Sequence, residues 1–146
     1  VAGGYLLFHR RLPHIWTAVS SDLQEWQDHQ ILMETIPGGW EEFKIGIAGP
    51  PLRIRQGYLM IYHAVDKNHT YRLGAALLDG ENPRKVVRRL PEPILEPELE
   101  WEKAGHVPNV VFSCGQVVKD DFLYVYYGAA DRVIGVAGIE LSKIVF

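Results

Sequence analysis

The stretch KIGIAGPPLRIRQGYLMIYHAVD, from Lys44 to Asp66, decides how we interpret the whole chain. A short apolar run broken by glycine and proline passes through a turn into a second, strongly apolar run that ends at His63 and Asp66. Glycine and proline in such positions mark turns, and apolar runs of this length between turns are typical of buried β-strands. The pattern predicts two neighbouring strands that bring Lys44 and His63 to one rim of a β-sheet.

The second half of this stretch, GYLMIYHAVD, recurs twice in weaker form. The related segments are GYLLFHRRLP, which begins at Gly4, and FLYVYYGAAD, which begins at Phe122. When the three segments are superimposed, Arg10, His63 and Gly128 fall at one equivalent position. A functional site is therefore expected at this position of the repeat.

The repeat predicts an all-β fold. Each unit contains an aromatic-rich strand followed by a strand with small residues, which are Thr17-Ala18, Gly74-Ala75 and Gly135-Val136. Units of about 40–50 residues with four short antiparallel strands are typical of β-propeller blades, and small residues fit close packing near a central channel. We predict one domain over residues 1–146, a partial propeller of about two and a half to three four-stranded blades. The blade-like units are about 1–36, 37–96 and 97–146, and the alternative is a β-sandwich with accidental similarity.

Two short segments have a different pattern. In SSDLQEW, Ser20 or Ser21 is suited to cap one helical turn, and PELEWEKAG is predicted to form an acidic loop with a helical turn. The charges of KVVRR and ELEWEK are expected on solvated faces. The strands are expected at about 5–9, 15–20, 30–33, 44–54, 58–65, 71–78, 85–89, 107–119, 122–128 and 133–141.

The composition is that of an ordinary globular protein and excludes several classes. The 146 residues are 47% apolar, carry a net charge of -3 with mixed signs, and include one cysteine. This charge does not favour nucleic-acid binding, and no apolar run approaches the ~20 residues of a membrane-spanning helix. A single cysteine allows neither an intrachain disulfide nor a zinc-ligand pattern. We therefore expect no metal, no nucleic-acid or membrane partner, and a cytoplasmic location.

Cationic side chains at loop–strand boundaries are the main candidates for a functional site. Arg10 follows an apolar strand, Lys44 precedes a glycine-containing strand, and His63 lies near the end of the most apolar strand. These groups can bind phosphate or carboxylate, and glycine allows a ligand to approach the backbone closely. The alternative is three separate, solvated charges. The sequence motifs GxGxxG, GxSxG and HExxH and the Walker phosphate loop are absent.

A second set of residues has the chemistry of a sugar site. Asp131 follows Tyr126-Tyr127-Gly128, so aromatic faces and a carboxylate, which suit sugar rings and hydroxyls, occur together. His14, close to Trp16, has the same character. Asp66 is interpreted as a turn residue. The four tryptophans are expected mainly in the core or between blades.

Seven motifs in order carry a family resemblance: HRRLPHIW, KIGIAGPP, GYLMIYHAVD, YRLGAALLD, PEPILEPE, PNVVFSCG and LYVYYGAADRVIGVA. They closely resemble the β-mannoside phosphorylases of glycoside hydrolase family 130, of the β-1,4-mannooligosaccharide or mannosylglucose phosphorylase kind. The likeness covers nearly the whole chain and corresponds to the carboxy-terminal portion of the family pattern. It implies a five-bladed propeller with its active site at the central axis. It also implies inverting phosphorolysis of β-mannosidic bonds to α-mannose 1-phosphate, although some members are hydrolases.

The resemblance also assigns residues to roles. Arg10, Lys44 and His63 match the phosphate-binding positions, and His14 and Asp131 match positions expected to touch mannose. Inorganic phosphate is then the co-substrate, and no other cofactor is expected. The family's general acid, an Asp in an Asp-Pro-Arg-like context, has no counterpart here. We therefore assign no catalytic residue and expect the isolated chain to have little or no turnover.

Two classes of function remain open. The chain is either an enzyme fragment, from a β-mannoside phosphorylase or a β-mannosidase of the same family, or a non-catalytic carbohydrate- or phosphate-binding or assembly module. It begins at Val1 rather than Met and ends on the apolar LSKIVF, so we expect a piece of a larger protein. A partial propeller leaves open edges and apolar faces. The expected partners are therefore small carbohydrates, phosphate, another copy of the chain, or a missing propeller half.

Overall fold

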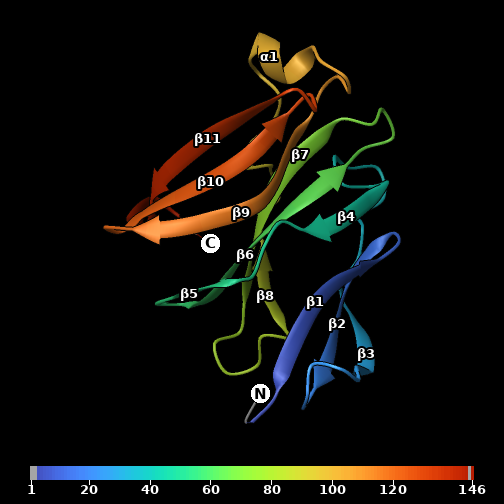
Figure 1. Cartoon of the computed structure of the whole chain (residues 1–146), viewed down its shortest axis with the longest axis vertical. Coiled ribbons are helices and arrows are strands. Elements are labelled where there is room, and N and C mark those ends of the chain that lie inside the picture. The colour runs from blue at the N-terminus through green and yellow to red at the C-terminus, as the bar shows by residue number, and fades with distance from the viewer. Residues whose placement is uncertain (1–2, 145) are drawn as a thin grey trace.

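A computed structural model describes residues 3–144 and 146, except for the side chain of Cys114. The chain is mostly β and forms three antiparallel sheets in chain order (Figure 1). The first sheet contains β1 (Tyr5–Arg11), β2 (His14–Ser20) and β3 (Gln27–Met33). The middle sheet contains β4 (Lys44–Ile47), β5 (Leu52–Ile54), β6 (Gly57–Val65), β7 (Tyr71–Leu78) and β8 (Val86–Arg89). The last sheet contains β9 (Val111–Lys119), β10 (Phe122–Ala129) and β11 (Val133–Glu140), preceded by α1 (Glu100–Lys103) and followed by a 3-10 turn at Leu141–Lys143.

The strands differ from the predicted ones in their division and in some of their ends: β3 begins at Gln27 and not at residue 30, and β9 begins at Val111 and not at residue 107. The run expected at 44–54 is two strands, β4 and β5, which both pair with β6. Pro50 and Pro51 lie between them, and proline cannot donate a backbone hydrogen bond to a sheet. The first and last sheets each show three strands in the described part of the chain, as the predicted strand positions imply, so neither is a complete four-stranded blade.

The expected helical turn in SSDLQEW is wrong. Ser20 does cap the segment, because its Oγ accepts hydrogen bonds from the backbone N–H groups of Asp22 and Leu23. Leu23 then has a φ of 67°, which is incompatible with a right-handed helix, so the segment is an irregular turn. The helical turn expected in PELEWEKAG is confirmed as α1.

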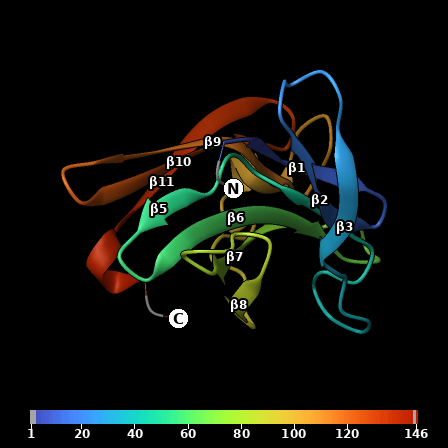
Figure 2. The ribbon, with the colours of Figure 1, turned by 90° about the horizontal axis from the view of Figure 1, so that it is seen from below.

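The middle sheet is covered on both faces, as Figure 2 shows from below. On β6, Met60 and Tyr62 pack with the first sheet, whereas Leu59 and Ile61 pack with the last sheet. Side chains alternate between the two faces of a strand, so a strand buried on both faces needs an uninterrupted apolar sequence. This explains why GYLMIYHAVD is the most apolar of the three repeats.

A buried group of five residues joins the middle sheet to the loop before β4. Tyr62 donates its hydroxyl to Glu41 at 2.9 Å, and its ring stacks on Trp40 with 6.0 Å between centroids. Arg89 forms an ion pair with Glu41. Gly74 lies opposite Tyr62 on β7, and a Cβ atom there would lie 2.3 Å from the Tyr62 ring. The glycine therefore makes room for the stacked aromatic rings.

The same arrangement recurs in the last sheet. Tyr127 donates its hydroxyl to Glu102 at 2.7 Å and stacks on Trp101, again with 6.0 Å between ring centroids. Gly135 lies opposite, where a Cβ atom would be 2.7 Å from the Tyr127 ring. The expected solvated position is wrong for Glu102, which is 2% exposed, and for Arg89, which pairs with a buried carboxylate. Trp101 packs on Tyr127 but is 37% exposed, so it does not have the core position expected for tryptophan.

These two groups correct the reason given for the small-residue strands. Gly74 and Gly135 provide space for a Tyr–Trp stack rather than for close packing at a central channel. In the first sheet the strand register pairs His9 with Trp16, as it pairs Tyr62 with Gly74. Trp16, and not Thr17, therefore lies at the position of the glycine.

Candidate functional site

Arg10 on β1 and His63 on β6, predicted at equivalent repeat positions, are in contact. The guanidinium Nη1 of Arg10 lies 3.5 Å from Nε2 of His63. Gly46 on β4 pairs with His63 and faces the same contact: a Cβ atom at Gly46 would lie 2.4 Å from His63 Nε2 and 3.3 Å from Arg10 Cδ. The glycine of the Lys-Ile-Gly motif thus leaves the space in which these two side chains meet.

His63 is buried but not fully satisfied by hydrogen bonds. It is 5% exposed, its ring lies 4.4 Å from that of Phe112 on β9, and its Nδ1 has no hydrogen-bond partner within the described residues. Burial, which is the largest cause, and the positive charges of Arg10 and Lys44 together lower the pKa of His63 to about 4. The imidazole is therefore neutral at pH 7, with one N–H to donate.

Lys44 contributes the second positive charge of the cluster. It lies two residues before Gly46 on β4, and residues two apart share a face of a strand. Its Nζ lies 5.2 Å from the ring centroid of Tyr71 and 5.8 Å from that of Phe43. Contact with these rings limits the motion of the long side chain and adds a cation–π attraction.

The cluster has uncompensated positive charge. In the described part of the chain neither Arg10 nor Lys44 belongs to an ion pair with a carboxylate. Two cations and a neutral N–H donor around a glycine can bind an oxyanion with charge-assisted hydrogen bonds. An anion placed here would also offset the repulsion that lowers the pKa of His63.

The buried imidazole predicts a pH-dependent stability. The pKa of about 4 in the folded chain is below the ordinary 6.5, so a proton on His63 favours unfolding. The stabilisation is complete above pH 6.5 and is lost as the pH falls through 4. We expect wild type to lose about 3 kcal/mol more than His63→Gln between pH 7 and pH 4, measured by urea unfolding. Parallel pH profiles for the two proteins would contradict this.

The residues predicted to touch sugar lie in three different settings. His14 begins β2, is half-buried, and its Nδ1 accepts the backbone N–H of Thr35 at 3.3 Å. Its hairpin is joined to β4 by a hydrogen bond from Ile45 N–H to the Pro13 carbonyl. Asp131 is exposed in the turn between β10 and β11 and makes no side-chain hydrogen bond within the described residues.

Tyr127 is 5% exposed, and its hydroxyl is committed to Glu102. Burial raises the pKa of Tyr127, as does the Glu102 carboxylate. Burial alone would raise the pKa of Glu102, but hydrogen bonds from the Leu99 amide, the Tyr127 hydroxyl and the Glu98 amide lower it below its ordinary value. This placement favours a structural role for Tyr127 in place of the sugar-binding role predicted from the sequence.

Asp66 has the turn role that the sequence predicted. Its carboxylate accepts the backbone N–H groups of Asn68 and Thr70 and pairs with Arg72 at 2.8 Å. Burial alone would raise its pKa, but the Arg72 hydrogen bond and the two amides lower it. Asp66 is therefore an ionised turn residue rather than an acid catalyst.

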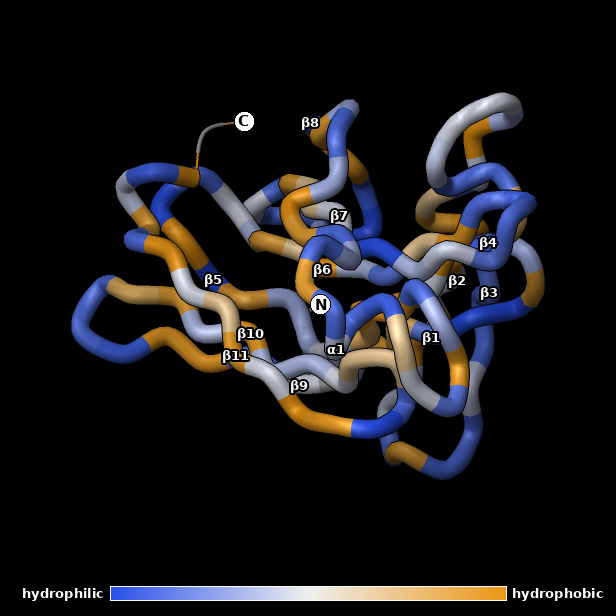
Figure 3. The backbone as a smooth tube through the Cα atoms, turned by 90° about the horizontal axis from the view of Figure 1, so that it is seen from above, coloured by the Kyte–Doolittle hydropathy of each residue, from blue (hydrophilic) through white to orange (hydrophobic). Residues whose placement is uncertain are grey.

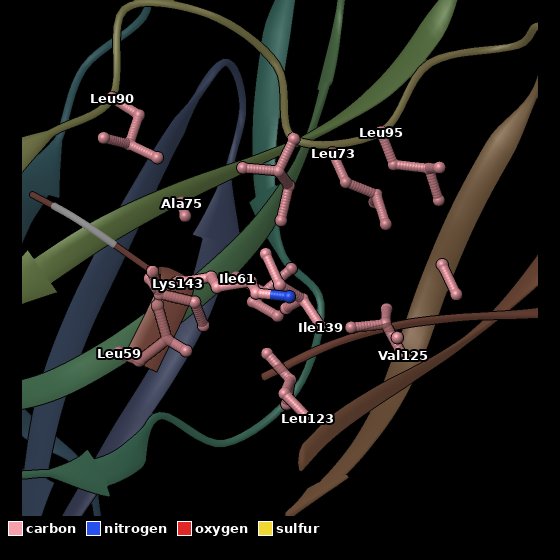
Figure 4. Close-up of a pocket in the computed structure, with 14 residues that line it drawn as sticks. Leu59, Ile61, Leu73, Ala75, Leu90, Leu95, Leu123, Val125, Ile139 and Lys143 are labelled. Carbon is pink, nitrogen blue, oxygen red and sulfur yellow. The ribbon is translucent and has the colours of Figure 1, made fainter. Parts of the chain in front are cut away.

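A cavity of about 390 Å³ lies apart from the cations, between the middle and last sheets. Figure 4 shows aliphatic side chains of both sheets around it, and Lys143 also lines it. Such a lining has few groups for phosphate or sugar hydroxyls. Within the described residues there is also no group of three metal-ligating side chains, and no helix is long and apolar enough to cross a membrane.

Comparison with known proteins identifies the family. The family model for glycoside hydrolase 130, described as β-1,4-mannooligosaccharide phosphorylase, matches residues 1–146. The chain belongs to this family. A 1,2-β-oligomannan phosphorylase of Thermoanaerobacter sp. (strain X514) is 57% identical over 146 residues, which are 100% of this chain and 49% of the relative. A β-1,2-mannobiose phosphorylase of the same strain is 59% identical over the same length, 48% of that relative.

A solved structure supports the same assignment. The β-1,2-mannobiose phosphorylase of Listeria innocua, in complex with β-1,2-mannobiose, matches with a TM-score of 0.93 and 34% identity. The match covers 98% of this chain and 42% of that structure. The chain thus spans about half the length of its relatives in the glycoside hydrolase 130 family.

Sequence reasoning missed two residues of the site. Phe112 lies in the PNVVFSCG motif but has no polar atom to mark it as functional, and only its contact with His63 reveals its position. Gly46 was noted only as a place for close backbone approach. The sequence signal for its stricter role was present, since Gly46 stands between Lys44 and the turn that leads to His63.

Proposed function

We propose that the chain carries the phosphate-binding part of an inverting β-mannoside phosphorylase. The observation that carries this proposal is the cluster of Arg10, Lys44 and His63 around Gly46, without a neutralising carboxylate in the described residues. Family membership supports it. We further propose that the three sheets are successive blades of a five-bladed propeller.

We also propose that the mannosidic bond is β-1,2-linked. The two Thermoanaerobacter relatives, at 57% and 59% identity, and the Listeria innocua structure are all described as acting on or binding β-1,2-mannosides. The sequence motifs alone resemble phosphorylases of the β-1,4-mannooligosaccharide or mannosylglucose kind and leave open which β-mannoside is used.

In this mechanism inorganic phosphate is the nucleophile. One phosphate oxygen attacks the anomeric carbon from the face opposite the glycosidic oxygen, the bond from that carbon to the glycosidic oxygen breaks, and α-mannose 1-phosphate forms. Arg10 and Lys44 neutralise the phosphate charge, and His63 donates its N–H. These contacts hold the nucleophile in line and reduce the entropic cost of attack.

The departing glycosidic oxygen needs a proton from a general acid. The family's acid Asp has no counterpart in these 146 residues, so we expect binding of phosphate but no turnover by the isolated chain. Release of α-mannose 1-phosphate from β-1,2-mannobiose by the purified chain would contradict this expectation.

Phosphate binding tests the proposal directly. We expect saturable binding of inorganic phosphate by calorimetry, weakened at least 10-fold in both Lys44→Ala and His63→Ala, because each removes a charge-assisted or buried donor. Lys143→Ala is the matched control: Lys143 is 65% exposed and lies at the apolar cavity.

Three results would decide against the proposal. Absence of binding by wild type means that these residues do not form an anion site in this chain. Equal weakening in Lys143→Ala means that binding reflects overall charge. Binding that survives both site variants places phosphate elsewhere and favours a β-mannosidase as the parent activity.

A further inference from the structure

Two histidine side chains face each other on the first sheet, apart from the cluster of Arg10, Lys44 and His63. Nδ1 of His29 on β3 lies 3.3 Å from Nε2 of His9 on β1, and the two ring planes are nearly perpendicular, at 89°. His9 directly precedes Arg10, and successive side chains of a strand point to opposite faces. The histidine pair therefore lies on the other face of β1 from the contact between Arg10 and His63, and the proposed function uses neither histidine.

The strand arrangement brings the two histidines together. β1 and β3 both pair with β2, so the side chains meet across the central strand of the sheet. β3 is irregular at this point: its register with β2 shifts between Thr17 and Val19, and Asp28 has a φ of 52°. Irregularities of this kind redirect side chains and are common next to functional sites. The first five residues of β3 are exposed, and Figure 3 shows this segment as hydrophilic, so an ion in solution can reach the pair.

The second ring nitrogen of His29 fixes the orientation of the ring. Nε2 lies 3.3 Å from the backbone carbonyl oxygen of Trp26, and a carbonyl oxygen can only accept, so Nε2 carries the proton and donates it. Nδ1 then presents its lone pair to His9. Metal-binding histidines almost always donate their other ring N–H to a carbonyl, a carboxylate or water. His29 therefore has the tautomer and the orientation of a metal ligand.

The distance between the two facing nitrogens matches that between two ligands of one metal ion. Tetrahedral Zn²⁺ with Zn–N bonds of ~2.0–2.1 Å places two imidazole nitrogens ~3.3–3.4 Å apart. The alternative is a hydrogen bond from His9 to His29, but 3.3 Å is long for an N–H donor, whose usual distances are about 2.7–3.2 Å. Partial burial lowers the pKa of His9, as do the charges of His29 and Arg11, so His9 is neutral at pH 7 and has a lone pair to offer.

We propose that His9 and His29 together bind one divalent transition-metal ion of the kind that imidazole prefers, such as Cu²⁺, Ni²⁺ or Zn²⁺. Within the described residues no group of three metal-ligating side chains includes this pair, so the ion keeps positions for water or for a ligand from another molecule. Arg11 opposes a cation here, so the affinity comes from the two metal–nitrogen bonds. The sequence predicted no metal from its single cysteine, whereas this pair forms only through strand pairing, 20 residues apart in the chain.

Calorimetry with Ni²⁺ and Zn²⁺ in a phosphate-free buffer tests the proposal. We expect one ion per chain, bound about 10-fold or more weakly in His9→Gln and in His29→Gln, because either change leaves a single ligand. His106→Gln is the matched control, since His106 is also exposed but lies outside the pair, and it is expected to bind as wild type does. Mg²⁺ prefers oxygen ligands and is expected not to bind. Far-ultraviolet circular dichroism verifies that the variants are folded.

Magnetic resonance of the histidine ring nitrogens identifies the bound atoms. Zn²⁺ is expected to shift Nδ1 of His29 and Nε2 of His9 more than the other ring nitrogens, while His29 keeps its proton on Nε2. Absence of saturable binding, unchanged affinity in His9→Gln or His29→Gln, an equal loss in His106→Gln, or shifts centred on other histidines would each overturn the proposal. The proposed function stands or fails separately, because it is measured with phosphate and with other variants.

Discussion

Replacement of Gly46 by alanine is expected to abolish phosphate binding while leaving the chain folded. The added Cβ atom would lie 2.4 Å from Nε2 of His63, a separation that non-bonded carbon and nitrogen atoms cannot adopt. His63 has little room to move, because it is buried against Phe112. Such overpacking costs about 1–3 kcal/mol, less than the usual total stability of a domain, but it displaces the imidazole from Arg10.

Calorimetry with inorganic phosphate measures this effect, and far-ultraviolet circular dichroism verifies the fold. Gly115→Ala is the control: Gly115 also lies within a strand, β9, but a Cβ atom there would meet nothing within 4 Å. Phosphate affinity of Gly46→Ala within threefold of wild type would show that the Arg10–His63 contact is not part of the anion site.

Removal of the Glu41 carboxylate is expected to cause the largest loss of stability, about 3–5 kcal/mol for Glu41→Ala. Glu41 is 3% exposed and accepts hydrogen bonds from both Tyr62 and Arg89. Its removal leaves a largely buried guanidinium without a counter-charge and a buried hydroxyl without an acceptor. Burial raises the pKa of Tyr62, so the hydroxyl stays protonated and needs that acceptor.

Urea unfolding of a double-mutant cycle measures this pair. Glu41→Ala combined with Arg89→Met is expected to be more stable than Glu41→Ala alone, because the second change removes the unpaired charge. Glu100→Ala, at an exposed position of α1, is expected to change stability by less than about 0.5 kcal/mol. Additive effects of the Glu41 and Arg89 changes would contradict a coupled pair.

Much of the fold was predictable because apolar alternation and turn residues are local signals. GYLMIYHAVD identified β6, and superposition of the repeats placed Arg10 and His63 at one equivalent position, where the structure brings them into contact. The contact between Arg10 and His63 was predictable because both lie at one position of the repeat, whereas Lys44 was predicted from its place before the glycine of β4.

The burial of individual side chains could not be predicted, because it depends on contacts between residues that are distant in the sequence. Nothing local distinguishes Glu102, which is buried under Tyr127, from its exposed neighbour Glu100. The direction of the Tyr127 side chain likewise follows from the strand register, and register is set by the whole sheet. The sequence signal for these buried groups was the Trp-Glu pair, which occurs at 40–41 and again at 101–102. Further along the chain the first pair has Tyr62 and Gly74 as partners, and the second has Tyr127 and Gly135.

The double coverage of β6 has a consequence for how the chain unfolds. If the first or the last sheet separated from the middle sheet, one face of β6, the strand that carries His63, would be exposed to solvent. We therefore expect the two interfaces of the middle sheet to unfold together with the cluster of Arg10, Lys44 and His63, so that opening of either interface also disturbs these side chains. A phosphate bound by Arg10, Lys44 and His63 would in turn stabilise the packing of both flanking sheets on the middle sheet, because a ligand that binds only the folded state raises its stability.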